Sequence, residues 1–178
     1  MSRAQAECLL ATGRLARLDV PASILRRGQS HPLLQDLRNK LEMALQRERD
    51  IVIMIGKEEP VNMDEGLQLC QALALLIAPH AAQIGAVIST GGETAHAILS
   101  AMGWKTLRLA GEIEPGVPLS VATGSRPVPV ITKAGAFGSR ETLLRCYETL
   151  RQRRAGSAGD TDPEPTDTGS TTLHRRAF

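Results

Sequence analysis

VISTGGETAHAIL, residues 87–99, predicts a buried strand, a glycine turn and a helix in immediate succession. Val87 and Ile88 supply the β-branched start of the strand, and Gly91 and Gly92 permit the tight turn. Apolar residues then recur at helical spacing. A glycine turn that opens a helix aims several backbone N–H groups at one place, with the positive end of the helix dipole behind them. This geometry suits an anion, and phosphate is the common one.

Glu93 makes this turn unusual for a phosphate site. Its carboxylate would repel a phosphate directly, so we expect it to hold a sugar hydroxyl, a metal ion or a backbone amide. The alternative is an ordinary strand-to-helix turn whose glycines serve only packing, because short glycine motifs are common.

The composition limits the classes of function. The chain has 178 residues, 42% apolar content, 2% aromatic content and a net charge of +2. The small charge and the scarcity of aromatic rings argue against nucleic-acid binding. No apolar run has membrane-spanning length and the first residues lack a signal-peptide core, so we expect no membrane association. Three widely spaced cysteines (Cys8, Cys70 and Cys146) predict free thiols in a reducing cytoplasm, and the scattered histidines predict no zinc-type metal site.

Before the central stretch, helical and strand patterns alternate along the chain. The expected elements are a helix over 3–12, a short strand over 15–20, a helix over 31–49, an apolar strand over 51–55 and a helix from 62 to about 79. Asn62 and Glu65 form a capping pair at the start of the last helix. This alternation predicts an α/β fold with a mostly parallel central sheet flanked by helices.

After Gly103 the pattern changes to an added β-hairpin region. Strands are expected over 105–109, 119–122 and 128–131, with a turn-rich segment at 111–118 and a second glycine loop at 132–138. Ser139 can cap the helix that follows, which ends near residue 154. Residues 155–178 contain few apolar residues, so we expect a disordered C-terminal tail after one domain over residues 1–154.

The two glycine loops, each after a strand and before a helix, are expected to meet at one sheet edge. Open α/β sheets bind ligands at the carboxyl ends of their strands. Lys133 ends its strand at this edge, where it would neutralise phosphate charge, and Lys57 follows another strand. An exposed lysine without a specific role is the alternative for both. Neither a Walker-type loop nor the dinucleotide glycine fingerprint is present, so a nucleotide site here would be of another kind.

Three segments resemble, in order, the nucleotide-binding C-terminal half of the four-carbon acid sugar kinase family. They are STGGETA at residues 89–95, GEIEPGVP at 111–118 and TKAGAFG at 132–138. In that family a GG-D/E-T turn, a G-E-x-x-PG-x-P segment and a K-x-G-x-FG loop form the ATP site. The match covers most of residues 50–145. The resemblance implies ATP and Mg²⁺ as cofactors and four-carbon acids such as erythronate, threonate or 3-oxo-tetronate as substrates.

The resemblance also assigns residues to the expected site. The opening residues 1–5 resemble the start of the same half, where a serine-containing turn touches the nucleotide. The expected nucleotide-binding set is Ser2, Gly91, Gly92, Glu93, Thr94, Lys133, Gly135 and Gly138. The glycines would approach the phosphates or ribose, and Lys133 would stand beside them. No catalytic base and no protein metal ligand is expected in this half.

Family enzymes also carry an N-terminal half that binds the sugar acid and that this sequence does not contain. The expected function is therefore the ATP-binding domain of a sugar-acid kinase, whose acid substrate binds through that missing half. The alternative is a free-standing, non-catalytic nucleotide-binding or regulatory module that acts with a separate partner chain. In both cases we expect a homo-oligomer or a partner chain, because a missing half would expose apolar surface.

Overall fold

The computed structural model describes residues 1–28, 31–47, 49–56, 63–124 and 126–157. Its helices are α1 (Ser2–Leu10), α2 (Ala22–Arg26), α3 (Pro32–Gln46), α4 (Met63–Ile77), the 3₁₀ helix η1 (Ala78–Gln83), α5 (Gly92–Ala101) and α6 (Thr142–Ser157). Its strands are β1 (Ala16–Val20), β2 (Ile51–Ile55), β3 (Val87–Thr90), β4 (Thr106–Glu114), β5 (Val117–Thr123) and β6 (Val128–Lys133).

The predicted α/β class and the added β-hairpin region are confirmed. β1 and β2 form a parallel pair, and a four-stranded sheet has the order β3-β6-β5-β4. In the larger sheet β3 and β6 are parallel, whereas β4, β5 and β6 form an antiparallel meander. Helices α2 and α3 connect the parallel strands β1 and β2, and the chain between the parallel strands β3 and β6 contains α5 followed by β4 and β5.

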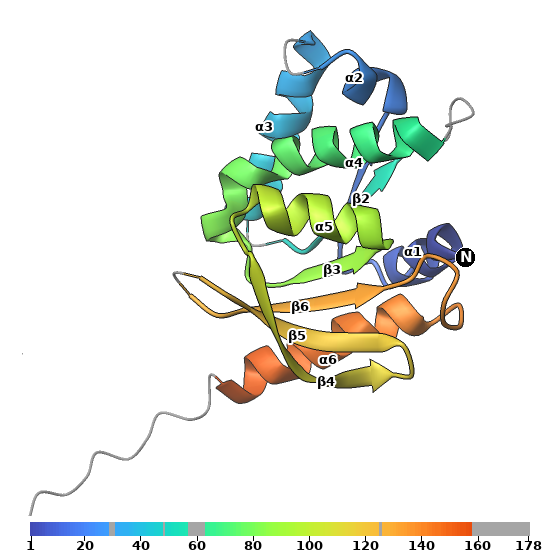
Figure 1. The fold of residues 1–178 in the computed structure, drawn as a ribbon, viewed down its shortest axis with the longest axis vertical. Helices are drawn as coiled ribbons and strands as arrows, with labels where there is room; N and C mark the ends of the chain where they lie inside the picture. Colours follow the sequence, from blue (N-terminus) through green and yellow to red (C-terminus); the bar gives the residue numbers. More distant parts are fainter. Residues whose placement is uncertain (29–30, 48, 57–62, 125, 158–178) are drawn as a thin grey trace, which may run out of the picture.

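The helices cover the strands from two sides (Figure 1). Buried residues of α2, α3, α4 and α5 form one core with β1 and β2. On the other side, α1 and α6 share a core with Met54 of β2 and Ile88 of β3. Also on α6, Cys146 packs with Leu119 of β5 and Ile131 of β6. The strands thus form the middle layer of a three-layer structure.

Several boundaries differ from the sequence-based expectation. β4 continues to Glu114, so most of the expected turn-rich segment is strand and only its Pro115-Gly116 corner turns. The short helix α2 was not expected. α6 continues to Ser157, past the expected end at residue 154. The rest of the expected tail, residues 158–178, lies outside the described residues, as do Lys57 and Asn62.

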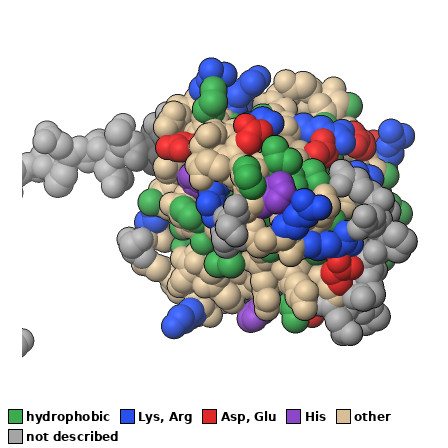
Figure 2. Space-filling view, turned by 90° about the horizontal axis from the view of Figure 1, so that it is seen from above, with side chains coloured by type: hydrophobic (Ala, Val, Ile, Leu, Met, Phe, Trp, Pro, Cys, Tyr) green, Lys and Arg blue, Asp and Glu red, His purple; other side chains and the backbone are tan. Residues whose placement is uncertain are grey.

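The end of the molecule at the top of Figure 1 carries a mixed surface. Figure 2 shows basic, acidic and apolar side chains interspersed on it. A shallow hollow of about 180 Å³ between α3 and β1 is lined by residues such as Lys40, Met43 and Arg49, and by none of the expected nucleotide-binding residues. None of the described helices combines the length and the apolar character needed to cross a membrane.

The carboxyl ends of β3 and β6 lie side by side and give the fold its candidate site. Thr90 is paired with Lys133 in the parallel ladder. Both strands end on the right in Figure 1, where the N-terminus of α1 and the loop before α6 also lie. The two glycine loops therefore meet at one edge of the sheet, as predicted.

Candidate functional site

The first glycine turn is tied to the neighbouring strand. Gly91 has a φ of 92°, which favours glycine, and its N–H donates to the carbonyl of Lys133 at 2.9 Å. It is also the N-cap of α5, so no cap side chain accepts from the N–H groups of the first helical turn. Gly92 has no atom within 4 Å of the place where a Cβ would stand. The start of α5 is therefore an open helix N-terminus with positive partial charge.

Glu93 and Thr94 differ in their surroundings. Glu93 is exposed in the first turn of α5. Thr94 is half-buried, and its hydroxyl lies 3.2 Å from the Cys70 thiol of α4. Thr94 therefore contacts the core beneath the turn, whereas the Glu93 carboxylate is free to meet a ligand group in solvent.

Lys133 is buried rather than exposed. Its side chain is 3% exposed, and its ammonium donates to the carbonyl of Ala134 at 2.8 Å. Burial lowers the pKa of Lys133, and the neighbouring Cys146 and Glu114 oppose that shift. Burial also raises the pKa of the Cys146 thiol to about 11. The alternative that Lys133 is an ordinary exposed lysine is therefore wrong.

The second glycine loop is held from the side of α1. The Ser2 hydroxyl donates to the carbonyl of Gly135 at 2.7 Å. The Gln5 amide donates to the carbonyls of Phe137 at 3.0 Å and Ser139 at 2.6 Å. The first turn of the N-terminal helix thus meets a loop that lies more than a hundred residues away in the sequence.

At Gly138 the space that a Cβ would take is occupied by neighbouring side chains. It has a φ of 82°, and a Cβ built on it would stand 2.8 Å from the Glu114 carboxylate and in collision with the Thr142 hydroxyl. Real Cβ atoms do not tolerate such distances, so only glycine fits here. Gly135, in contrast, has only the Ser2 hydroxyl near its Cβ position, at 3.6 Å.

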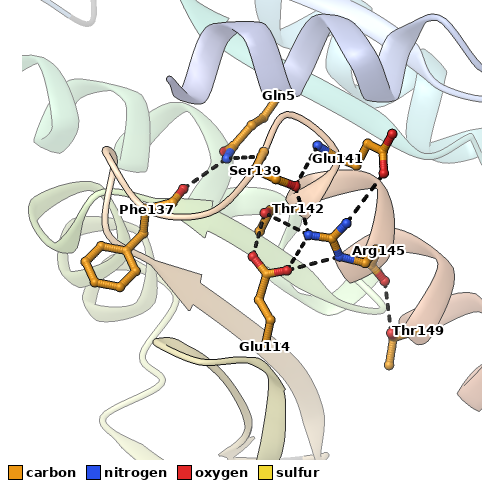
Figure 3. A network of polar contacts seen from close by, with 8 residues as sticks. All are labelled: Gln5, Glu114, Phe137, Ser139, Glu141, Thr142, Arg145 and Thr149. Atoms are coloured by element: carbon orange, nitrogen blue, oxygen red, sulfur yellow. Dashed lines mark hydrogen bonds and ion pairs between the residues drawn. The ribbon is translucent and has the colours of Figure 1, made fainter.

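Glu114 links the hairpin to the start of α6 (Figure 3). Its carboxylate accepts from the Thr142 hydroxyl at 2.5 Å and from Nε of Arg145 at 3.0 Å. The hydrogen bond from Thr142, followed by that from Arg145, lowers the pKa of Glu114. Arg145 also donates to the Ser139 hydroxyl at 2.9 Å, so the ion pair reaches back into the glycine loop.

We expect Glu114→Gln to remove part of the pH dependence of folding. Because the pKa of Glu114 is lowered from 4.5, its stabilising effect is present above that value and is lost as the pH falls through its folded-state pKa. Urea unfolding of the wild type and the variant should therefore differ at neutral pH and converge in acid. Glu148→Gln, on the exposed face of α6, is the control and should leave the pH profile unchanged. A pH-independent difference for Glu114→Gln would contradict the ionic role.

The three segments that carry the resemblance touch one another. Gly91 donates to Lys133, which joins the first turn to the second loop. The Phe137 ring lies over Gly116, 2.7 Å from that glycine's Cβ position, and Gly138 lies against Glu114. Gly91, Gly92, Glu93, Thr94 and Lys133 therefore form one group, and Ser2 and Gly135 another, joined through the short segment 133–135.

Sequence reasoning missed Gln5, Glu114, Thr142 and Arg145, which shape the second loop. Glu114 lies in segment 111–118 and Gln5 in the opening residues 1–5, but no local spacing connects Gln5 to a loop 132 residues away. Among the described residues, no three His, Cys, Asp or Glu side chains gather to hold a metal ion.

The chain is similar in sequence to known proteins. The family model described as "nucleotide-binding C-terminal domain" matches residues 1–143. A D-threonate kinase from Cupriavidus necator is 40% identical over 161 residues, which are 89% of this chain and 39% of that protein. A 3-oxo-tetronate kinase from Pseudomonas savastanoi pv. phaseolicola is 35% identical over 63 residues, which are 35% of this chain and 15% of that protein.

Solved structures share the fold. A Bordetella bronchiseptica protein, crystallised with bound citrate as a domain-swapped dimer, has a TM-score of 0.70 at 26% identity over 84% of this chain and 38% of that one. A Haemophilus influenzae protein has a TM-score of 0.61 at 17% identity, over 84% of this chain and 38% of that one, and shows the fold alone. The chain thus spans well under half the length of these relatives.

Proposed function

The chain belongs to the nucleotide-binding C-terminal domain family, the C-terminal half of four-carbon acid sugar kinases, and we propose that residues 1–154 are the ATP-binding domain of such a kinase. The single observation that carries this proposal is the burial of Lys133 at the end of β6, where the two glycine loops meet. A buried charge is destabilising unless it is paired. The hydrogen bond of Lys133 to a neutral carbonyl compensates little of that, and Glu114, the carboxylate that raises its pKa, is already bonded by Arg145. A phosphate at the sheet edge would supply the missing negative charge.

Different parts of the site would bind different groups of the nucleotide. The N–H groups of Gly92, Glu93 and Thr94 at the open start of α5 would bind phosphate oxygens, as helix N-termini commonly do. Lys133 would neutralise charge beside them, while Gly135 and Ser2 would approach the phosphates or ribose from the other loop. Gly138 contributes through the shape of the loop, because its Cα faces Thr142 and Glu114.

The exposed Glu93 carboxylate fits a sugar hydroxyl better than a phosphate, because like charges repel. Mg²⁺ would arrive with the nucleotide and would supply positive charge to the phosphates during phosphoryl transfer.

The acid substrate is proposed from the relatives. Those with the matching segments are named D-threonate kinase and 3-oxo-tetronate kinase, so a four-carbon sugar acid is the proposed phosphoryl acceptor. We place the acid-binding residues and the general base in the part of the relatives that this chain does not match. The protein's role in the reaction is then to position ATP and neutralise its charge.

We further propose that the domain works in an oligomer or with a partner half in the cytoplasm. β4 lies at the edge of its sheet and exposes Leu107 and Leu109, and a related structure is a domain-swapped dimer. The three cysteines of this chain are free thiols, which is the state that a reducing compartment maintains.

Lys133→Met tests the site directly. We expect the affinity for Mg-ATP to fall by roughly tenfold to a hundredfold, because a charge-assisted contact contributes about 1.5–3 kcal/mol. The free energy of unfolding should stay equal or rise, because the variant removes a buried charge. Calorimetric titration and urea unfolding measure the two effects, with Lys105→Met, an exposed lysine, as the control. Unchanged affinity together with lost stability would assign Lys133 a structural role only.

A further inference from the structure

Side chains of α1 occupy alternate carbonyl groups of the second glycine loop. Ser2 donates to the carbonyl of Gly135, and Gln5 donates to those of Phe137 and Ser139. In Figure 3 the Gln5 amide points from α1 down onto the loop, opposite the side from which Thr142 and Arg145 approach. The loop is thus fixed from both sides.

The orientation of the Gln5 amide is determined by its surroundings. Its Nε2 lies between two carbonyl oxygens, which can only accept, so the nitrogen must be on that side. Gln5 is 0% exposed, and its Oε1 has no hydrogen-bond partner among the described residues. A buried amide with an unsatisfied oxygen is unfavourable for folding. A purely apolar residue would suit this part of the core better, so the two donated hydrogen bonds explain the glutamine.

These hydrogen bonds engage carbonyl groups of the loop and leave several of its N–H groups without an acceptor among the described residues. The carbonyls at 135, 137 and 139 are engaged on the α1 side. The N–H of Phe137 donates to Ala134, whereas within the described part of the chain the N–H groups of Gly135, Ala136 and Gly138 have no acceptor. Carbonyl oxygens repel anions and N–H groups attract them. The loop therefore has N–H groups available for an anion, while its carbonyl oxygens are bonded to α1.

We propose that Gln5 is the positioning residue for phosphate recognition in this domain. By holding the carbonyls of Phe137 and Ser139, it keeps the loop in the conformation whose free N–H groups face the phosphates of the bound nucleotide. This inference rests on the proposed nucleotide site and adds a residue that makes no contact with the nucleotide itself. Ser2 contributes one bond of the same kind, and Gln5 contributes two.

Gln5→Leu removes both donated bonds at nearly constant volume. The affinities for Mg-ATP and for inorganic tripolyphosphate should fall about tenfold or more, because two hydrogen bonds that hold the loop are lost. The affinity for adenosine should stay within about twofold, because it carries no phosphate. Gln71→Leu, at an exposed position of α4, is the matched control and should bind all three probes as the wild type does.

Gln5→Glu adds a readout that a general packing defect would not give. An ionised carboxylate would face two carbonyl oxygens, which raises its pKa. When protonated, it can donate to one of them. The affinity of this variant for tripolyphosphate, relative to the wild type at the same pH, should therefore recover as the pH is lowered. Amide hydrogen exchange of the ligand-free chain should be faster in both variants at Phe137 and Glu141, whose N–H groups have acceptors within the loop, with the other segments unchanged.

The outcomes separate this inference from the proposed function. If the wild type binds Mg-ATP and Gln5→Leu binds it equally well, the positioning role is wrong while the nucleotide site stands. Equal losses for adenosine and tripolyphosphate would also overturn it, because they indicate a general defect of the site. If the folded wild type binds neither Mg-ATP nor tripolyphosphate, the proposed function fails and the inference fails with it. Selective loss of the phosphate probes supports both.

Discussion

Gly92→Val is expected to abolish nucleotide binding and leave the fold intact. Gly92 is the first residue of α5, is exposed, and has no atom within 4 Å of its Cβ position, so the valine side chain fits the free protein. In the complex it would occupy the space through which a phosphate approaches the backbone. Affinity for Mg-ATP should fall by about a hundredfold or more, a loss of roughly 3 kcal/mol. The free energy of unfolding should change by less than about 0.5 kcal/mol, as for other surface substitutions.

Gly85→Val is the control for this experiment. Gly85 is also exposed with nothing near its Cβ position, but it precedes β3 at the opposite end from the glycine turn. This variant should bind Mg-ATP as the wild type does. Gly135→Val should behave like Gly92→Val, because only the Ser2 hydroxyl lies near its Cβ position, at an ordinary contact distance of 3.6 Å. Wild-type affinity in both Gly92→Val and Gly135→Val would exclude the proposed site.

Gly138→Ala is expected to have the largest effect on stability. The residue has a φ of 82°, where L side chains are strained, and the new methyl group would collide with Thr142 and lie 2.8 Å from the Glu114 carboxylate. Backbone strain and overpacking each contribute roughly 1–3 kcal/mol, so we expect a loss of about 3 kcal/mol or more in the free energy of unfolding. Urea unfolding measures it. The collision also disrupts the hydrogen bond between Thr142 and Glu114, so the pH dependence assigned to Glu114 should weaken in the same variant.

Gly66→Ala, the same substitution at another site, is expected to raise the free energy of unfolding. Gly66 lies inside α4 with nothing within 4 Å of its Cβ position, and alanine favours helix over glycine by about 1 kcal/mol. This variant should be more stable than the wild type. A loss below about 1 kcal/mol for Gly138→Ala would show that the loop relaxes and that its shape is not fixed by Glu114 and Thr142.

The local features of the fold could be predicted from the sequence. The glycine turn between β3 and α5 was found because a β-branched run, two glycines and a helical period follow one another within residues 87–99. The continuous apolar run at 51–55 likewise indicated a strand covered on both faces, and β2 has these bounds. α2 was missed because five residues after a proline carry too little periodicity to be recognised. β4 extends past its expected end because the glycines and prolines of residues 111–118 indicate turns, whereas residues up to Glu114 pair with β5.

The site could be predicted only in part, because much of it depends on contacts between distant segments. The meeting of the two glycine loops follows from the rule that parallel strands align their carboxyl ends. The burial of Lys133 does not follow from its position at a strand end, since it depends on how α6 covers β6. The hydrogen bonds from Gln5 to the loop depend on how α1 packs against it, and no pattern within residues 1–10 predicts them. Local sequence patterns do not predict long-range hydrogen bonds of this kind.

Calorimetric titration of the chain with Mg-ATP, and separately with Mg-GTP, tests the proposed nucleotide site most directly. The sample must first show a cooperative unfolding transition, which establishes that any absence of binding is not caused by an unfolded chain. We predict saturable binding of Mg-ATP to one site, with an affinity between micromolar and low millimolar, and a comparison with Mg-GTP that reports the preference for the base. No saturable heat with either nucleotide in the folded chain would contradict the assignment of the two glycine loops and Lys133 as a nucleotide site.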